Sequence, residues 1–324
     1  MEKATILVGD AGGTNVRFAL AHADGGHVSI ASVWKKPGEN YPTFAGALDA
    51  YLAETKPKID GAAFGFAGAV RAGQVDMLNR SWSVDSRDLK AQLRLDRVVM
   101  VNDFFAMARS AAELGAGDVT EIAQGDSDPR GNVAVGGPGT GFGVAVLRHV
   151  HGGWVVVAGE GGHQAFAPQA EIDWQVAERL RARGIYVSNE IVTAGAGFDQ
   201  TRAALAEVMG VPDPKLPQAG IIAAAERGDR FAVEFCRLRA NTVMTAMGNT
   251  TLASDATGGV YLAGGVSQHL APWLKEKSAL ARFYSRGPRT GLLSRIAIRL
   301  ITSETAPLMG AAHLWLDDRT RGWL

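Results

Sequence analysis

Two patterns of apolar positions alternate along the first hundred residues of this chain. Short runs rich in β-branched and other apolar residues are typical of strands, and longer stretches with apolar residues at helical spacing separate them. The strand-like runs are 5–10, 16–21, 27–34, 59–68 and 97–103, and the helical stretches are 43–54 and 86–93. This alternation predicts an α/β domain built on a mixed sheet.

The pattern changes after residue 103. A helical stretch over 104–115 precedes four strand-like runs, near 120–123, 132–137, 142–150 and 153–160. From about 170 to 253 helical periodicity dominates, broken by a proline-bearing loop over 211–220. Strand character returns at 258–267 and 295–302, and 307–318 predicts a closing helix. A second lobe rich in helices is therefore expected.

A glycine pair interrupts the first strand-like run. In "ILVGDAGGTNVRFAL" a strand ends at Asp10, passes through Gly12, Gly13, Thr14 and Asn15, and a second strand begins. Glycine pairs favour tight hairpins because glycine enters left-handed conformations without steric cost. Because glycine has no Cβ, backbone N–H groups at such a turn can also approach anionic oxygens. The acid and the hydroxyl beside it suggest phosphate with a metal, although an ordinary tight hairpin is the favoured interpretation of this stretch taken alone.

A second stretch, "VAVGGPGTGFGVAVL", repeats this plan, with its turn at Gly139, Thr140 and Gly141. Two such hairpins could hold a polyphosphate with backbone donors. The chain contains neither G-x-x-x-x-G-K-[ST] nor a strand-linked G-x-G-x-x-G, which disfavours a P-loop NTPase or an NAD enzyme. Without a Walker lysine, magnesium, backbone amides and helix N-termini would have to meet the phosphoryl charge.

A third glycine pair, Gly264 and Gly265, follows a strand-like run and precedes a possible helix. Close packing of the strand against the helix would explain it. So would a surface on which a flat adenosine lies. The local sequence leaves both interpretations open.

Five polar residues are candidates for substrate chemistry: Asn102, Asp103, Glu160, His163 and Glu190. Asp103 ends a β-branched strand, where a carboxylate could take the proton of a substrate hydroxyl as that oxygen attacks phosphorus. Helix capping is the simpler role for Asn102 and Asp103, and a helix-dipole effect for Glu190. Together, acids, Asn and His can hydrogen-bond the hydroxyls of a polyol.

Composition narrows the class of protein. A chain of 324 residues exceeds the usual size of one core, so two domains are expected. The 33 basic and 33 acidic residues balance, which gives no electrostatic footprint for nucleic acid or membrane. The single Cys236 excludes a disulfide framework and a multi-cysteine zinc site. With no signal-peptide or membrane-spanning pattern, we expect a cytoplasmic protein.

The ordered set of motifs resembles the bacterial ATP-dependent glucokinases, which have the two-domain actin-like (ribonuclease H-like) sugar kinase fold. The motifs are "GDAGGTNVRFAL", "LNRSW", "VNDFFAMA", "GGPGTGFGVA", "GEGGHQAFAP", "YLAGGVS" and "PLMGAAHL". The resemblance implies a small α/β domain over 1–113 plus 306–324, a larger α+β domain over 114–305, and glucose bound between them. It also suggests a homodimer.

Residue roles follow from the same resemblance. Asp103 would be the catalytic base, and the sugar hydroxyls would be held by Asn102, Glu160, His163 and Glu190. Asp10 would help to place Mg²⁺ with ATP. The ATP site would comprise Asp10, Gly12, Gly13, Thr14, Asn15, Gly139, Thr140, Gly141, Gly264 and Gly265. The expected reaction converts glucose and ATP to glucose 6-phosphate and ADP, and feeds glycolysis.

Two stretches depart from the family pattern. The family has G-H-x-D-F where this chain has Gln164, Ala165 and Phe166 after His163, so an acid is missing. Its S-G-P-G-L turn is replaced by residues 193–198. A kinase of mannose, fructose or an N-acylhexosamine, or a sugar sensor without activity, therefore remains an alternative. The related ROK kinases carry a cysteine-rich zinc motif, which a single cysteine cannot form.

Overall fold

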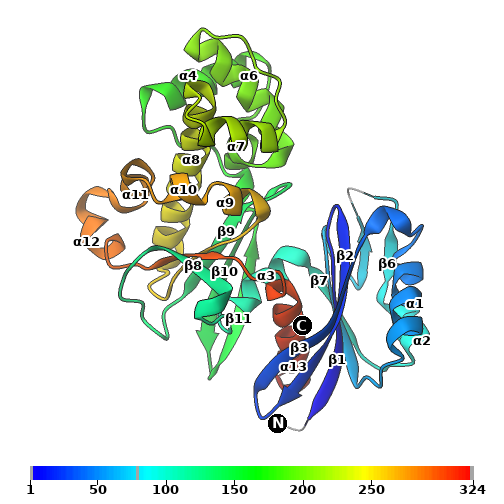
Figure 1. Cartoon of the computed structure of the whole chain (residues 1–324). Coiled ribbons are helices and arrows are strands. Elements are labelled where there is room, and N and C mark those ends of the chain that lie inside the picture. Colours follow the sequence, from blue (N-terminus) through cyan, green and yellow to red (C-terminus); the bar gives the residue numbers. More distant parts are fainter. Residues whose placement is uncertain (1–2, 78–79, 322–324) are drawn as a thin grey trace. The chain divides into compact units, whose positions relative to one another are not determined.

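The computed structural model describes residues 3–77 and 80–321, which form two compact units (Figure 1). Unit 1 contains the described residues of 1–118, 149–156 and 303–324. Unit 2 contains 119–148 and 157–302. The domain limits derived from the family resemblance stay a prediction.

Unit 1 is built on the mixed sheet that the alternating pattern predicts. Its strand order is β3-β2-β1-β4-β7, with β1 antiparallel to β2 and parallel to β4, and β4 parallel to β7. The strands are β1 (Ala4–Ala11), β2 (Asn15–Asp24), β3 (His27–Pro37), β4 (Gly61–Phe66) and β7 (Val98–Asn102). A small hairpin of β5 (Gln74–Asp76) and β6 (Ser83–Asp85), too short to show a pattern in the sequence, is separate from this sheet.

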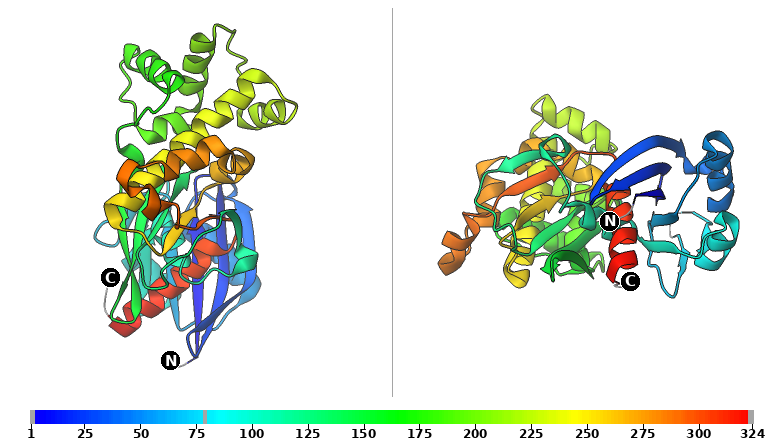
Figure 2. Two further views of the ribbon diagram at one scale, coloured as in Figure 1. Left: turned by 90° about the vertical axis from the view of Figure 1, so that its left-hand side faces the viewer. Right: turned by 90° about the horizontal axis from the view of Figure 1, so that it is seen from below.

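Helices cover both faces of this sheet (Figure 2). On one face, Leu7 packs in a core with Leu48 of α1 (Phe44–Thr55) and Leu89 of α2 (Ser86–Leu93). On the other, Ile6 and Val8 share a core with α3 (Asp103–Ser110) and α13 (Ala306–Arg321). Burial on both faces explains why β1 reads as a continuous apolar run.

Helix α3 packs tightly against α13. A Cβ on Gly310 of α13 would lie 1.7 Å from the carbonyl oxygen of Ala106 on α3, so only glycine permits this contact. Buried Arg109 pairs with Glu113 at 2.9 Å and with Asp317 at 2.7 Å. Helix α3 ends at Ser110, five residues before the predicted end. The C-terminal helix thus holds the helix that begins with Asp103.

The second sheet has the strand order β11-β10-β9-β12-β13-β8. Strand β9 is antiparallel to β10 and parallel to β12, which in turn is parallel to β13, and β8 closes the other edge antiparallel to β13. The strands are β8 (Val119–Ala123), β9 (Val133–Pro138), β10 (Phe142–Val150), β11 (Gly153–Gly159), β12 (Gly259–Leu262) and β13 (Ile298–Ile301).

The predicted helical region of unit 2 forms around α8 (Arg230–Ser254), which is buried along most of its length. The other helices are α4 (Glu171–Ala182), α5 (Asn189–Thr193), α6 (Phe198–Met209), α7 (Gln218–Glu226), α9 (Gly265–His269), α10 (Ala271–Leu274), α11 (Lys277–Tyr284) and α12 (Thr290–Leu293). Throughout the described residues, no helix combines the length and apolar character needed to cross a membrane.

Candidate active site

The first glycine turn is a two-residue hairpin between β1 and β2. The N–H of Gly12 donates to the carbonyl of Asn15 at 3.0 Å, which leaves Gly13 and Thr14 at the tip. Neither glycine has a positive φ, so the left-handed conformation expected for this pair is not the one it adopts. A Cβ on Gly12 would meet only the Asn15 carbonyl, at an ordinary 3.6 Å. At Gly12, then, the fold itself does not demand glycine.

The carbonyl groups at the tip of this turn face one side of the hairpin. Arg80 Nη2 donates to the Gly13 carbonyl at 2.8 Å, and the Gly38 N–H donates to the Thr14 carbonyl at 2.9 Å. In a trans peptide the C=O of one residue and the N–H of the next point in opposite directions. The N–H groups of Thr14 and Asn15 therefore point away from Arg80 and Gly38. Two adjacent donors on one side suit an anion.

Arg80 was not among the residues singled out from the sequence, although it lies in the motif "LNRSW". Its guanidinium stacks over the ring of Trp82, 4.6 Å from the centroid, while it holds the Gly13 carbonyl. Only the position of this motif in the family pattern could have pointed to it. Leu78 and Asn79 of the same motif lie outside the described residues.

The second glycine turn, between β9 and β10, is one residue shorter, but its carbonyls are also held from one side. Its Gly139 N–H donates to the Gly141 carbonyl at 2.7 Å. The carbonyls of Gly139 and Thr140 accept from the N–H groups of Gly195 and Ala196, both at 2.9 Å. By the same peptide geometry, the N–H groups of Thr140 and Gly141 point away from the 195–197 turn. Each unit thus presents one pair of backbone donors.

The structure separates the two members of the third glycine pair. Gly264 has φ +89°, and a Cβ there would lie 2.3 Å from the Pro138 carbonyl oxygen. Close packing against the second glycine turn therefore accounts for Gly264. At Gly265, the first residue of α9, a Cβ would meet nothing within 4 Å. Contact with a nucleotide stays a prediction for both glycines, and at Gly265 no packing contact explains the glycine.

Two carboxylates lie at the carboxyl ends of parallel strands in unit 1. Asp10 on β1 is in register with Gly65 on β4, and a Cβ on Gly65 would lie 3.2 Å from Asp103 Cα. Asp10 is buried and its Oδ2 accepts from Arg17 Nη1 at 2.6 Å. Burial raises the pKa of Asp10, although Arg17 opposes that rise. The carboxyl ends of parallel strands are where α/β folds bind ligands.

Asp103 has a strongly perturbed pKa. Desolvation, and next the negative charge of Asp10, raise the pKa of Asp103 to about 7, while the N–H of Phe104, which donates to its Oδ1 at 2.8 Å, opposes the rise. A pKa near neutrality gives this carboxylate the proton affinity that a general base needs.

Helix capping falls to Asn102 and not to Asp103. Asn102 Oδ1 accepts from the N–H groups of Phe104 at 2.9 Å and Phe105 at 3.3 Å, and its Nδ2 donates to the Gly68 carbonyl at 3.1 Å. The cap fixes the start of α3 and with it the Asp103 side chain. An amide nitrogen carries two N–H groups, so one donor of Asn102 beyond the bond to Gly68 can serve a ligand.

The remaining polar candidates gather in unit 2. Glu190, in the first turn of α5, accepts from the Phe142 N–H through Oε2 at 2.8 Å, and its Oε1 lies 3.9 Å from His163 Nε2. A Cβ on Gly141 would lie 2.8 Å from Glu190 Oε2, so glycine makes room for this carboxylate. The side chain of His163 is 61% exposed. His163 ends a single 3-10 turn, Gly161–His163, and the exposed Glu160 directly precedes that turn. Glu190 thus joins the predicted sugar residues to the second glycine turn.

The two stretches that depart from the family pattern pack beside Glu190. The Asn189 N–H donates to the Gln164 carbonyl at 3.0 Å, and Ala165 forms a bridge with Ser188. A Cβ on Gly197 would lie 1.9 Å from the Ile191 carbonyl oxygen, so the proline-free turn still requires glycine there. Main-chain contacts therefore hold both stretches in place, and the departures from the family pattern change only their side chains.

Magnesium would have to be held with few protein ligands. Across residues 3–77 and 80–321, no cluster of three or more His, Cys, Asp or Glu side chains could hold a metal ion. Mg²⁺ that arrives with a nucleotide needs only one or two carboxylates besides phosphates and water. Asp10, with one oxygen committed to Arg17, retains a second oxygen for that purpose.

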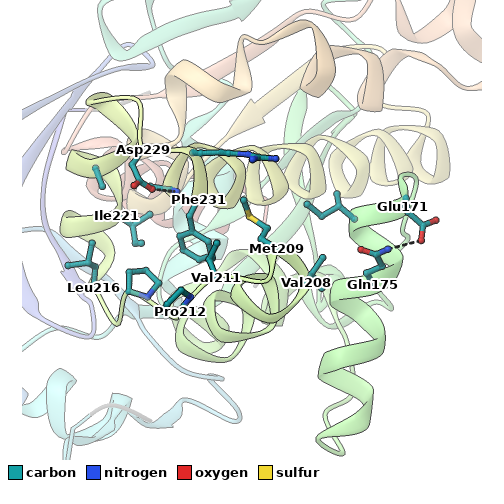
Figure 3. Close-up of a pocket in the computed structure, with 15 residues that line it drawn as sticks. Glu171, Gln175, Val208, Met209, Val211, Pro212, Leu216, Ile221, Asp229 and Phe231 are labelled. Atoms are coloured by element: carbon teal, nitrogen blue, oxygen red, sulfur yellow. Dashed lines mark hydrogen bonds between the residues drawn. The ribbon is translucent and has the colours of Figure 1, made fainter.

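A cavity of about 710 Å³ in unit 2 lies among α4, α6, α7 and α8 (Figure 3). Apolar side chains such as Met209, Val211 and Phe231 dominate its lining. None of the residues predicted to bind sugar or nucleotide lines it. The candidate site therefore rests on the turns and carboxylates described above and not on this cavity.

Comparison with known proteins decides the family. A family model described as glucokinase matches residues 7–318. The chain belongs to the glucokinase family. The glucokinase of Saccharophagus degradans is 33% identical over 317 residues, which are 96% of this chain and 98% of that protein. The glucokinase of Chromobacterium violaceum is 35% identical over 315 residues, covering 95% and 88%. The family predicted from the ordered motifs is thus confirmed.

Solved structures agree with the glucokinase family. A glucokinase from an Antarctic psychrotroph superimposes with a TM-score of 0.88 at 30% identity, covering 97% of this chain and 99% of that one. A Balamuthia mandrillaris glucokinase, solved in complex with glucose, has a TM-score of 0.78 at 20% identity and covers 96% and 93%. At 20% identity, the similarity to the Balamuthia mandrillaris structure shows only a shared fold. The predicted sugar kinase fold is confirmed, and glucokinases are phosphotransferases that act on sugars.

Proposed function

We propose that this protein transfers the γ-phosphoryl group of ATP to the 6-hydroxyl of glucose. The observation that carries the proposal is Asp103, whose pKa of about 7 and place at the strand ends, across Gly65 from Asp10, suit a base. Membership of the glucokinase family supports the same reaction.

The proton and the phosphoryl group move in one displacement. Asp103 takes the proton of the sugar 6-hydroxyl as O6 attacks the γ-phosphorus. The new O6–P bond forms as the bond between the γ-phosphorus and the bridging oxygen of ADP breaks. The proton ends on Asp103 and the negative charge of the leaving group ends on ADP. A base with a pKa near 7 can release that proton again at neutral pH.

Sugar recognition would fall to Glu160, His163, Glu190 and the remaining Asn102 donor. Carboxylates accept hydrogen bonds from hydroxyl groups, and each can take two neighbouring hydroxyls. The bond from the Phe142 N–H to Glu190 Oε2 leaves Oε1 of that carboxylate to face the sugar. Because this hydrogen bond already restricts the rotamers of Glu190, little conformational entropy is lost when its carboxylate binds the sugar.

Phosphate binding would use the two pairs of backbone donors, at Thr14 and Asn15 and at Thr140 and Gly141. Mg²⁺ enters as part of the nucleotide substrate, and Asp10 is the residue that would hold it. When bound, the ion neutralises phosphate charge. Gly265, where a Cβ would meet open space, would let adenosine lie close to the start of α9.

The test is release of ADP by the purified protein with Mg·ATP and a panel of hexoses. We expect turnover with glucose to exceed turnover with mannose, fructose and N-acetylglucosamine. Turnover on another sugar alone would keep the chemistry and overturn glucose as the substrate. Sugar binding by calorimetry without any turnover would favour a sensor built on the kinase fold.

Replacing the base tests the mechanism. Asp103→Asn keeps the side-chain volume but cannot take a proton, so kcat should fall by about 10²- to 10⁴-fold. Glucose affinity, measured by calorimetry, should stay within a few-fold of the wild-type value. Near-normal turnover of this variant would remove Asp103 from the proposed role.

A kinase of a different hexose is the second candidate, because the departures at Gln164, Ala165 and the 193–198 turn adjoin Glu190. The missing acid and the changed turn alter side chains near the sugar residues without altering Asp103.

We further propose that the enzyme acts in the cytoplasm, where its single buried cysteine stays reduced, and as a homodimer.

A further inference from the structure

Arg239, on α8, is the largest fully buried side chain of the described residues, at 1% exposure. Its guanidinium lies over the rings of Phe198 and Phe235, 5.2 and 5.4 Å from their centroids. No described carboxylate forms an ion pair with it, and burial lowers its pKa to about 10, so it remains a cation at neutral pH. Its Nη1 has no hydrogen-bond partner among the described residues.

A buried cation without a carboxylate, and with one unsatisfied nitrogen, is a poor device for stability alone. Both bonds that Arg239 does make go to one acceptor. Its Nε and Nη2 donate to the Thr193 carbonyl at 3.0 and 2.5 Å. Thr193 is the last residue of α5, where a helix exposes unpaired carbonyls that a cation can satisfy.

The Thr193 carbonyl lies at the junction of two groups of candidate residues. Upstream, α5 carries Glu190, whose Oε2 accepts from the Phe142 N–H. Downstream, the turn donates from Gly195 and Ala196 to the carbonyls that orient the second glycine turn. Phe198, whose ring faces the same guanidinium, closes that segment. Arg239 thus holds the segment 193–198 at both of its ends.

We propose that Arg239 is a positioning residue that sets the Glu190 carboxylate and the second glycine turn together, and so links sugar binding to nucleotide binding. This inference rests on the proposed function. Arg239 touches neither substrate. It acts by holding one main-chain carbonyl, whose position orients α5 on one side and the donors at Thr140 and Gly141 on the other.

Arg239→Met removes both bonds while it keeps most of the side-chain length. We expect calorimetry to show weaker binding of both glucose and the non-hydrolysable analogue AMPPNP, each by about tenfold, as loss of a buried hydrogen-bonded group predicts. Arg239→Lys keeps the charge and one donor and should lose less, about threefold.

A double-mutant cycle separates positioning from general stability. If Arg239 acts through Glu190, then Arg239→Met should weaken glucose binding by less than about twofold in a Glu190→Gln background, because coupled residues are not additive. Full additivity of the two effects on glucose affinity would overturn the inference.

Arg286 offers a control. It is a half-buried arginine of unit 2 that also donates to main-chain carbonyls, those of Phe283 at 3.1 Å and Thr245 at 2.9 Å, neither of which belongs to the segment 193–198. Arg286→Met should lower the melting temperature and leave both affinities unchanged. Equal losses of affinity in the two arginine variants would sink the positioning role.

The wild-type protein separates the two proposals. Wild-type protein that binds neither glucose nor AMPPNP would overturn the proposed function, and this inference with it. Wild-type protein that binds both, with Arg239→Met within twofold of it, would overturn this inference alone.

Discussion

A carboxylate that works as a base near neutral pH must keep its pKa close to the working pH. For Asp103 the rise comes first from burial at the start of α3 and next from the charge of Asp10. Asn102 occupies the capping position, so Asp103 is not needed to satisfy the helix end. One side chain provides the helix cap, which leaves its neighbour available for chemistry.

The pH dependence of the reaction follows from this pKa. Asp103 must be unprotonated to act, so kcat/KM for glucose at saturating Mg·ATP should rise with pH and level off above about 7. Asp10→Asn removes a charge that raises the pKa of Asp103, so the rising limb should move to lower pH. The measurement to compare is the pH at which kcat/KM reaches half of its plateau. The plateau value itself would also fall if the variant bound the nucleotide less well. An unmoved limb would show that Asp10 does not influence the base.

Individual residues differ in how far the sequence could predict them. Asp103 and Asn102 stand next to each other at a strand end, so local pattern was enough to single them out. Arg80 and Arg239 act on carbonyls 67 and 46 residues away along the chain, and no local pattern carries that information. The roles of Asp103 and the sugar residues stay predictions until they are measured.

At the scale of elements, the two glycine turns differ in length but share one feature. In each, the carbonyls at the tip are held by other groups of the same unit, and the next N–H groups point the opposite way. The sequence predicted both hairpins from their glycines. It could not show that Gly12 and Gly13 avoid positive φ, because several turn geometries accept a glycine pair.

Glycines of the second turn offer a matched pair of substitutions. Gly141→Ala would place a Cβ 2.8 Å from Glu190 Oε2, so the carboxylate must shift and its bond to the Phe142 N–H should weaken. The KM for glucose should rise by up to about tenfold, the size expected if that charge-assisted bond is lost. At Gly139 the nearest atom to a Cβ is 4.0 Å away, so Gly139→Ala should leave that KM unchanged. Equal glucose KM values for the two variants would contradict the packing argument.

At the scale of the molecule, α13, which is late in the sequence, packs against β1, the first strand, within unit 1. The sequence predicted this helix over 307–318 and, through the family, its place in the small domain. The side chain of His313 in α13 is buried, and its Nδ1 lies 3.5 Å from Glu113 Oε1. The same carboxylate oxygen also pairs with Arg109. Desolvation, and next the charge of Arg109, lower the pKa of His313 to about 4.

Acid should therefore weaken the fold through His313. Its folded pKa lies below the ordinary value of 6.5, so unfolding takes up a proton as the pH falls from 6.5 toward 4. The free energy of unfolding should drop by up to about 3 kcal/mol over that range. Urea titrations of the wild type and His313→Asn at pH 7 and pH 4.5 would measure it. The variant, which cannot titrate there, should lose correspondingly less, and equal losses would contradict the assignment.

The dependence of the first sheet on α13 also has a consequence for biosynthesis. Residues such as Leu308 and Ala312 cover the face of the sheet that carries Ile6 and Val8. A ribosome completes the strands β1, β2, β3, β4 and β7 roughly two hundred residues before it reaches α13, and domains generally fold as units during synthesis. Until α13 has been synthesised, α3 alone covers this face of the sheet in the nascent chain, and the residues of unit 2 are complete before unit 1 can finish folding.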